Sequence, residues 1–384
     1  MYRMLVVYQH LPHYRRDAFR ALEDTPGWNV HFAAGTSSRD PGIATLRHDD
    51  LESVHELTNV WAGPFLWQRG LMRLLGEKWD HVIFLGDVAY LSTWAGAARR
   101  KLAGKPVSFW TIGWHRPEVG LRRRVRIAFY RLADGLLLYG ERARQFGIEA
   151  GYPGQRMTVV HNSSSDPPDH LEEDDARLEE IRLALRAIPH PAVGAVLRLT
   201  SQKRLDLLLD AAAYSAAATD RHLSVVLAGE GPEYDGLSRK AQDLGVDLHL
   251  LGPVYGSRAL ELFYGTCLVT VVPSRAGLTT IQSLKFGRPV VTHDDAEMQV
   301  PEFEAIVPGV TGGLYHRDDV PGLAHTIDHW VQRVQRDSAS VAHECRTEVR
   351  RQWSPQATAR LIMDYVSASA AQRRADGPDL GRKK

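Results

Sequence analysis

The segment VGAVLRLTSQKR (residues 193–204) decides how the chain folds. Its first half is a short apolar run that is typical of a buried strand and that ends at Arg198. A turn follows, and an apolar helical stripe begins just after Lys203, with Leu205, Leu208 and Leu209. A short strand, a loop and an amphipathic helix in this order predict one unit of a parallel α/β sheet.

Two cations flank the loop of this segment. Arg198 stands at the strand end and Lys203 at the start of the next helix, where free backbone amides add partial positive charge. A diphosphate suits such a clamp, because Arg198 offers a planar fork of donors and Lys203 a point charge. Taken alone, the pair also fits a solvated face of a surface helix; the segments that follow favour the anion site.

The same alternation of strand and helix runs along the whole chain. It predicts an α/β fold with parallel sheets covered by helices on both faces, arranged as two Rossmann-like domains. The expected strands are Met4–Tyr8, Val30–Ala33, His81–Leu85, Val107–Trp110, Leu136–Tyr139 and Thr158–His161, followed by Ala192–Leu197, Leu223–Ala228, Leu248–Leu251, Leu268–Val272 and Pro289–His293.

Composition places the domain boundaries. Residues 163–180 (SSSDPPDHLEEDDARLEE) have the composition of a linker that leads into an acidic helix. We therefore expect an N-terminal domain over 1–165 and a second domain over 166–353. Ser354-Pro355 starts a further helix over 354–370. The polar residues 371–384 are expected to form a disordered tail.

Bulk composition excludes several classes of protein. The 47 Lys and Arg against 46 Asp and Glu create no basic field, so nucleic acid is not an expected partner. Two cysteines, Cys267 and Cys345, exclude a disulfide scaffold and favour a reducing cytoplasm. We expect neither a signal peptide nor a spanning helix, because no apolar run is long enough.

Loops that follow the N-terminal strands carry candidate acceptor-binding residues. The loop in YQHLPHYRRDAF (8–19) and the loop in FLGDVAYLSTW (84–94) leave strand ends at the carboxyl edge, where doubly wound sheets bind ligands. Each residue also has a structural interpretation, which for Asp87 is a helix N-cap. The candidates are His10, His13, Tyr14, Arg15 and Asp87.

Three later segments extend the pattern of residues 193–204: LSVVLAGEGPEYDGL (223–237), VPSRAGLTTIQSLKFGRPVV (272–291) and PEFEAIVPGVTGGLY (301–315). In order, spacing and residue type, the set resembles the nucleotide-binding domain of family-4 glycosyltransferases of the GT-B fold. FWTIGWHRPEVGLRRRVRIAFYRLADGLLLYG (109–140) and THDDAEMQVPEFEAI (292–306) further resemble a subgroup from bacterial polysaccharide and natural-product gene clusters.

This resemblance implies a fold and an activity. The two parallel sheets would face each other across a cleft, and the C-terminal helix would cross back to the first domain. A sugar would pass, with retention of configuration, from a nucleoside-diphosphate sugar to a saccharide, lipid-linked or small natural-product acceptor. No cofactor or metal is expected, since positive side chains take that role in GT-B enzymes, and Asp294-Asp295 is interpreted as loop.

The resemblance also implies roles for single residues. Arg198 and Lys203 would stabilise the leaving diphosphate. Glu302 or Glu304 would hold hydroxyls of the donor sugar, and Trp114 would lie on the acceptor side. The expected donor-binding residues are Gly229, Gly231, Pro253, Val254, Ser274, Arg275, Ala276, Gly277, Leu278, Thr279, Gln282 and Glu302.

Two departures from the family matter. The catalytic-loop histidine of the family aligns with Ile112, and His115 lies three residues later, so we expect His115 to do that work or the loop to have another role. Two glutamates of the donor loop are replaced by Ser274 and Gln282. A glutamine still binds a ribose hydroxyl but brings no charge.

A basic helix follows this loop. Residues 115–144 hold eight arginines against three acids, and Arg122–Arg126 alternate with apolar residues. Such a face suits an anionic membrane surface or a lipid-diphosphate acceptor, and hence peripheral contact with the inner face of the membrane. The alternative is a solvated helix face.

Two other functions stay open. One is a nucleotide-sugar epimerase of the GT-B fold. The other is a non-catalytic nucleotide-sugar binder, which would fit Ile112 at the position of the family's catalytic-loop histidine. A dehydrogenase is disfavoured, because AGEGPE (228–233) lacks the third glycine of the dinucleotide fingerprint.

Overall fold

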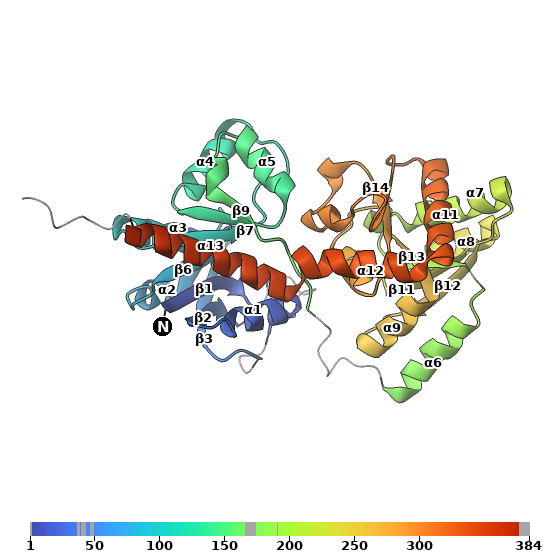
Figure 1. Cartoon of the computed structure of the whole chain (residues 1–384), viewed down its shortest axis with the longest axis horizontal. Helices are drawn as coiled ribbons and strands as arrows, with labels where there is room; N and C mark the ends of the chain where they lie inside the picture. Colours follow the sequence, from blue (N-terminus) through green and yellow to red (C-terminus); the bar gives the residue numbers. More distant parts are fainter. Residues whose placement is uncertain are drawn as a thin grey trace, which may run out of the picture. The chain divides into compact units, whose positions relative to one another are not determined.

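The computed structural model describes residues 2–36, 39, 44–46, 50–165, 174–189 and 191–375. The chain forms two compact units. Unit 1 comprises residues 1–165 together with 354–384, and unit 2 comprises residues 166–353. Each has its own parallel sheet and core (Figure 1).

Unit 1 is built on a seven-stranded sheet of order β3-β2-β1-β6-β7-β8-β9 within the described residues. All its pairings are parallel. Its strands are β1 (Tyr2–His10), β2 (Trp28–Gly35), β3 (Val54–Glu56), β6 (His81–Leu85), β7 (Val107–Thr111), β8 (Gly135–Leu138) and β9 (Met157–Val159), and a separate antiparallel hairpin pairs β4 (Thr58–Ala62) with β5 (Phe65–Arg69).

Helices cover both faces of this sheet because successive strand side chains point to opposite sides. Leu5 and Val7 of β1 join the core under the helices that follow β5, β6, β7 and β8. Met4 and Val6 join the core under the first and last helices of the chain. The helical segments are η1 (His13–Arg15), α1 (Arg16–Glu23), α2 (Leu71–Leu74), α3 (Leu91–Leu102), α4 (Gly120–Tyr130), α5 (Glu141–Glu149), η3 (Gly154–Arg156) and α13 (Pro355–Ala375).

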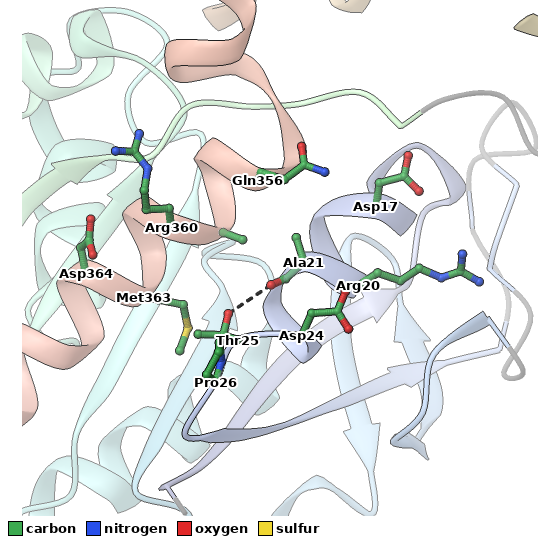
Figure 2. A pocket seen from close by; sticks show the side chains of 11 residues that line it. Asp17, Arg20, Ala21, Asp24, Thr25, Pro26, Gln356, Arg360, Met363 and Asp364 are labelled. Carbon is green, nitrogen blue, oxygen red and sulfur yellow. Dashed lines mark hydrogen bonds between the residues drawn. The ribbon is translucent and has the colours of Figure 1, made fainter.

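Helix α13 belongs to unit 1, although it follows unit 2 in the sequence. The Ser354 hydroxyl accepts a hydrogen bond from the Ala357 amide (3.1 Å), and Pro355 is the first helical residue. Ile362 and Val366 are fully buried against the sheet. Figure 1 shows α13, in red, lying along this sheet, and it packs against α1. A hollow of about 600 Å³ lies between the two helices and is lined by both (Figure 2).

The prediction of a disordered tail from residue 371 is wrong for its first five residues, because α13 continues to Ala375. No glycine or proline interrupts the sequence before Gly377. The Arg373 guanidinium also pairs with Asp134 (2.7 Å) and donates to the Gly104 carbonyl (2.9 Å), which ties the last turn to the unit. Residues 376–384 lie outside the described residues.

Unit 2 carries a six-stranded parallel sheet of order β12-β11-β10-β13-β14-β15 within its described residues. Two apolar clusters pack on its opposite faces. Its elements are α6 (Asp175–Arg186), β10 (Ala192–Val196), η5 (Ser201–Lys203), α7 (Leu205–Thr219), β11 (Ser224–Ala228), α8 (Tyr234–Leu244), β12 (Asp247–Gly252), α9 (Ser257–Thr266), β13 (Cys267–Val271), α10 (Leu278–Lys285), β14 (Val290–His293), η6 (Ala296–Met298), η7 (Pro301–Ala305), β15 (Gly312–Tyr315), α11 (Val320–Arg336), α12 (Ser338–Glu348) and the π-helical turn η8 (Val349–Trp353).

The predicted α/β class, with two sets of parallel strands between helices, is confirmed. Among the described helices, none has the length and apolar run needed to cross a bilayer.

Candidate functional site

The order of the unit 2 strands places two loops side by side. From β10 the chain proceeds to β11 and β12 on one side of the sheet, and later to β13, β14 and β15 on the other. The loops after β10 (197–204) and after β13 (272–277) therefore leave the carboxyl edge at the switch point of the sheet, where doubly wound folds bind ligands. The Thr279 hydroxyl joins them by donating to the Val196 carbonyl (3.1 Å).

A glycine loop supports the loop that carries Arg198. The Leu197 amide donates to the Ala228 carbonyl, and the Leu199 amide to the Glu230 carbonyl (2.9 Å each). A Cβ atom on Gly229 would lie 1.9 Å from the Leu197 oxygen, so no larger residue fits. The same holds for Gly231, whose Cβ would lie 2.1 Å from the Leu199 oxygen. Both glycines thus set the backbone beside Arg198, and their contact with a donor stays a prediction.

Three cations lie at this edge of the unit 2 sheet. Arg198 and Arg275 are exposed and Lys203 is half-buried. Burial, and then the charge of Arg275, lower the pKa of Lys203 below its usual 10.5. Within the described part of the chain, none of the three forms an ion pair. The neighbouring Arg204 and Arg317, in contrast, pair with carboxylates of Asp318 and Asp295 (2.8 Å each).

A pocket of about 330 Å³ opens beside Arg275, and neither Arg198 nor Lys203 is among its lining residues. Of the predicted donor-binding residues it contains Ser274 and Arg275. Burial and the nearby Arg317 lower the pKa of His293 below its usual 6.5, so its ring is neutral at pH 7. The full lining is Gln202, Arg204, Pro273, Ser274, Arg275, His293, Met298, Arg317 and Asp318.

Gln299 organises the donor loop and was missed from the sequence. Its Oε1 accepts from the Ala276 amide (2.8 Å), and its Nε2 donates to the Ser274 carbonyl (3.3 Å) and to Thr292 Oγ1 (3.1 Å). Ala276 is one of the expected donor-binding residues, and in this structure Gln299 already uses its amide. A single glutamine in a loop carries no pattern that could have revealed this. Gln299 binds the amide of Ala276, and this contact does not extend to the amides at the start of α10, after Gly277.

Two predicted donor-binding side chains point into the core. Gln282 Oε1 accepts from the Tyr264 hydroxyl (3.0 Å), since one helical turn carries Gln282 away from the start of α10. Val254 is buried in the cluster under α6 and α9, and the Pro253 carbonyl accepts from Arg177 (3.4 Å). Glu302 is also buried, at 6% exposure, in η7, where Glu304 is half-buried.

Asp294 and Asp295 both bind other groups of the protein. Asp294 accepts from the Arg317 amide (3.3 Å), and Asp295 caps η6 and pairs with the Arg317 guanidinium (2.8 Å). In the described residues no group of three metal-ligating side chains occurs.

Unit 1 has its own switch point, between β1 and β6. A pocket of about 340 Å³, here called the unit 1 pocket, opens there at the carboxyl ends of β1, β6, β7 and β8. It is lined by Tyr8, Gln9, His10, Pro12, Tyr14, Arg15, Leu85, Gly86, Asp87, Val88, Tyr90, Thr111, Ile112, Gly113, His115, Arg126 and Tyr139.

Five predicted site residues meet in this pocket: His10, Tyr14, Arg15, Asp87 and His115. They come from three strand ends and the loops that follow them, about a hundred residues apart in sequence. One Asp87 oxygen accepts from the Ala89 amide (2.8 Å), so this carboxylate shapes a turn and is not the N-cap of α3. His10, Tyr14, Arg15 and His115 line the cavity together with Ile112.

An ion pair anchors the loop that carries His115. Arg126 of α4 contacts both Glu118 oxygens at 2.7 Å, and it also donates to the Gly113 carbonyl (3.3 Å). Both side chains are about four-fifths buried. The sequence predicted a membrane role for Arg126, but this side chain faces the unit 1 pocket and holds the loop at residues 113–118.

Two further residues predicted for the acceptor side lie outside the unit 1 pocket. Trp114 is 1% exposed, and its ring packs among Tyr130 and Tyr152 instead of binding an acceptor. His13 does not line the pocket, because its Nδ1 lies 3.2 Å from the Ala44 carbonyl and bridges η1 to that segment. Neither contact is local in sequence.

Comparison with known proteins fits this geometry. Residues 190–333 match the family model of glycosyl transferases group 1. No curated protein matches the chain in sequence. Similar solved structures include HepE of Anabaena with UDP (TM-score 0.70, 16% identity, covering 96% of this chain and 100% of that one). A glycosyltransferase of Rickettsia africae is also similar (0.71, 13%, 96% and 98%).

Sucrose-phosphate synthase of Thermosynechococcus elongatus gives a TM-score of 0.64 at 17% identity, covering 97% of this chain and 100% of that one. At these identities the likeness establishes the fold, which is that of GT-B glycosyltransferases. The family match over 190–333 on this fold supports a glycosyltransferase.

Proposed function

We propose that unit 2 binds a nucleoside-diphosphate sugar and that the chain transfers this sugar to an acceptor held in the unit 1 pocket. The observation that carries the proposal is the group of cations Arg198, Lys203 and Arg275, which have no ion-pair partner in the described residues and lie at the switch point of the unit 2 sheet. Uncompensated positive charge, half-buried at Lys203, favours an anionic ligand.

The chemistry follows from where charge develops. The bond between sugar and diphosphate breaks, and negative charge grows on the phosphate oxygens. Arg198 and Lys203 stabilise that charge more in the transition state than in the ground state, as catalysis requires. They take the part that a metal ion plays in other sugar transferases. Retention of configuration rests on the family-4 resemblance alone.

Similar proteins suggest the first ligand to test. HepE structures contain UDP, UDP-glucose, and UDP with glucose. We therefore propose a UDP-hexose as the first donor and a saccharide or saccharide-bearing lipid as the acceptor.

An exposed patch on α4 supports contact with an anionic membrane. Val119, Leu121 and Val125 are 84%, 76% and 41% exposed, and Arg122 and Arg124 between them are also exposed. Apolar residues interleaved with arginines are typical of a helix that lies on an anionic lipid surface. We propose that this α4 patch brings the chain to a lipid-linked acceptor.

Replacing Arg198 or Lys203 by Ala tests the donor site. Each change removes a charge-assisted contact and should weaken UDP binding by about 1.5–3 kcal/mol, measured by calorimetry. Arg258→Ala is the matched control, because its guanidinium pairs with Asp175 at the surface of unit 2 (3.3 Å). Unchanged UDP affinity in both site variants would remove the donor site from this edge.

One observation favours a second function. Ile112 lines the unit 1 pocket at the position of the family histidine, which suits a non-catalytic nucleotide-sugar binder. UDP-hexose that binds but is neither transferred nor hydrolysed, with a panel of saccharides present, would favour this alternative.

A further inference from the structure

Arg15 is a buried cation that lines the unit 1 pocket. It ends the short helix η1 directly after β1, and only 3% of it is exposed. Four aromatic rings surround its guanidinium carbon, at centroid distances of 4.6 Å (Trp110), 4.7 Å (Tyr139), and 5.8 Å (Tyr8 and Tyr14).

This cation has no carboxylate partner among the ion pairs of the described residues. The rings attract it through their π faces, and Tyr14 shares a hydrogen bond with it, but none of these groups brings a negative charge. Arginine keeps its proton in proteins. A buried, unneutralised charge is costly unless a counter-ion joins it.

Arg100, another buried arginine of unit 1, shows the contrast. Its guanidinium donates to the Pro106 carbonyl (2.8 and 3.0 Å) and to the Trp79 carbonyl (3.1 Å), so it links backbone segments of the core. Arg15 instead borders a cavity of about 340 Å³, which is at the small end for a ligand site and suits one sugar-sized group.

The other polar groups of the pocket limit the charge of the ligand. Asp87 is exposed and presents a carboxylate to this pocket. A carboxylate repels a second anion and accepts hydrogen bonds from sugar hydroxyls. Arg126 also lines the pocket, but Glu118 neutralises it. The pocket thus offers one buried cation without a carboxylate partner among the described residues and one solvated carboxylate, which fits a ligand that has one anionic group and several neutral hydroxyls.

We propose that the acceptor carries an oxyanion, either a carboxylate or a phosphate on the sugar, which the Arg15 guanidinium binds in the unit 1 pocket. This inference rests on the proposed function, because it names the class of acceptor. Arginine suits both groups, since its fork of donors matches two oxygens at once.

Binding of small probes tests this without requiring turnover. Glucose, glucose 6-phosphate and glucuronate are titrated against the wild type, Arg15→Gln, Arg15→Lys and the control Arg20→Gln, which alters an exposed arginine of α1. We expect the wild type and the control to bind one anionic sugar roughly 10- to 100-fold more tightly than glucose. Arg15→Gln should abolish this preference, and Arg15→Lys should retain part of it.

The affinities of the two anionic probes are then compared. The probe that binds more tightly shows whether the site prefers a phosphate or a carboxylate. Two results would overturn the proposal: a wild type that binds neither anion better than glucose, or a preference that survives in Arg15→Gln. Urea unfolding, measured on each variant, reports that unit 1 is folded, and UDP binding reports that unit 2 is folded. UDP binding that persists without an anion preference refutes the acceptor class alone, whereas a wild type without UDP affinity refutes the proposed function.

Discussion

At the scale of single residues, Lys203 gives the donor site a pH dependence. Burial and Arg275 lower its pKa below 10.5, so its charge is lost at a lower pH than that of an ordinary lysine. Only the protonated form attracts a diphosphate. UDP affinity should therefore be full below the lowered pKa and fall as pH rises through it.

Arg275→Gln checks the cause of this pH dependence. The change removes the nearby charge, so the alkaline decline in UDP affinity should move to higher pH, although affinity at neutral pH falls because one cation is lost. Calorimetry over a series of alkaline pH values measures both effects. A decline at the same pH in the variant would show that Arg275 does not act on Lys203.

His115 is the second residue whose role can be tested alone. It lines the unit 1 pocket on the loop that Arg126 and Glu118 anchor. An imidazole there can exchange a proton with a sugar hydroxyl near neutrality. His115→Ala should lower kcat roughly 100-fold or more and leave UDP affinity unchanged.

His13→Ala is the control for His115, because His13 contacts the Ala44 carbonyl outside the pocket and its loss should spare kcat. Equal turnover in the wild type and His115→Ala would leave the loop without a catalytic histidine.

At the scale of elements, α4 has two differently used faces. Arg126 is turned inward to Glu118, and Arg123 donates to the Ala150 carbonyl (2.8 Å), so these two arginines serve the fold. Arg122 and Arg124 are exposed beside Leu121. Two of the four arginines over residues 122–126 therefore belong to the α4 patch.

Arg122→Gln with Arg124→Gln tests membrane contact. Each arginine near an anionic bilayer contributes about 1 kcal/mol, so the double variant should bind vesicles that contain phosphatidylserine roughly 30-fold more weakly. Sedimentation with vesicles measures this, and added salt should weaken the wild type. Arg182→Gln with Arg186→Gln on α6 serves as control. A wild type that binds anionic and neutral vesicles equally would exclude the contact.

Element prediction succeeded where the pattern is local and strong. The strand over His81–Leu85 is as predicted, and the other ten expected strands differ by a few residues at their ends. The short strands β3 and β15 and the hairpin of β4 and β5 were missed. Gly312–Tyr315 has two glycines and little apolar character, so only pairing with β14 makes it a strand. The hairpin has no Asn-Gly or Asp-Gly turn signal.

At the scale of the whole molecule, the last helix completes the core of the first unit. Ile362 is fully buried between α13 and the sheet. Ile362→Ala should destabilise unit 1 by about 2–5 kcal/mol through the cavity it leaves, which urea unfolding measures. Ser367→Ala, at an exposed position of the same helix, is the control. If both variants unfold at the wild-type urea concentration, the packing of α13 does not stabilise the unit.

The sequence by itself determined the α/β class, the alternation of strands and helices, and the loops that carry Arg198, Lys203, Asp87 and His115. These follow from periodicity and from the rule that ligands bind at carboxyl edges, both of which are readable along the chain. Strand order then brings loops of distant sequence into one pocket in each unit.

Only the tertiary structure decided which side chains in those loops remain available to a ligand. Gln299 uses the Ala276 amide from 23 residues away, and Trp114 packs between rings that arrive from α4 and from residue 152. Arg126 faces Glu118, whereas Arg15 has no carboxylate partner among the described residues. A residue type states what a side chain can bind, but its partners come from elements far away in sequence, and burial beside those partners determines its role.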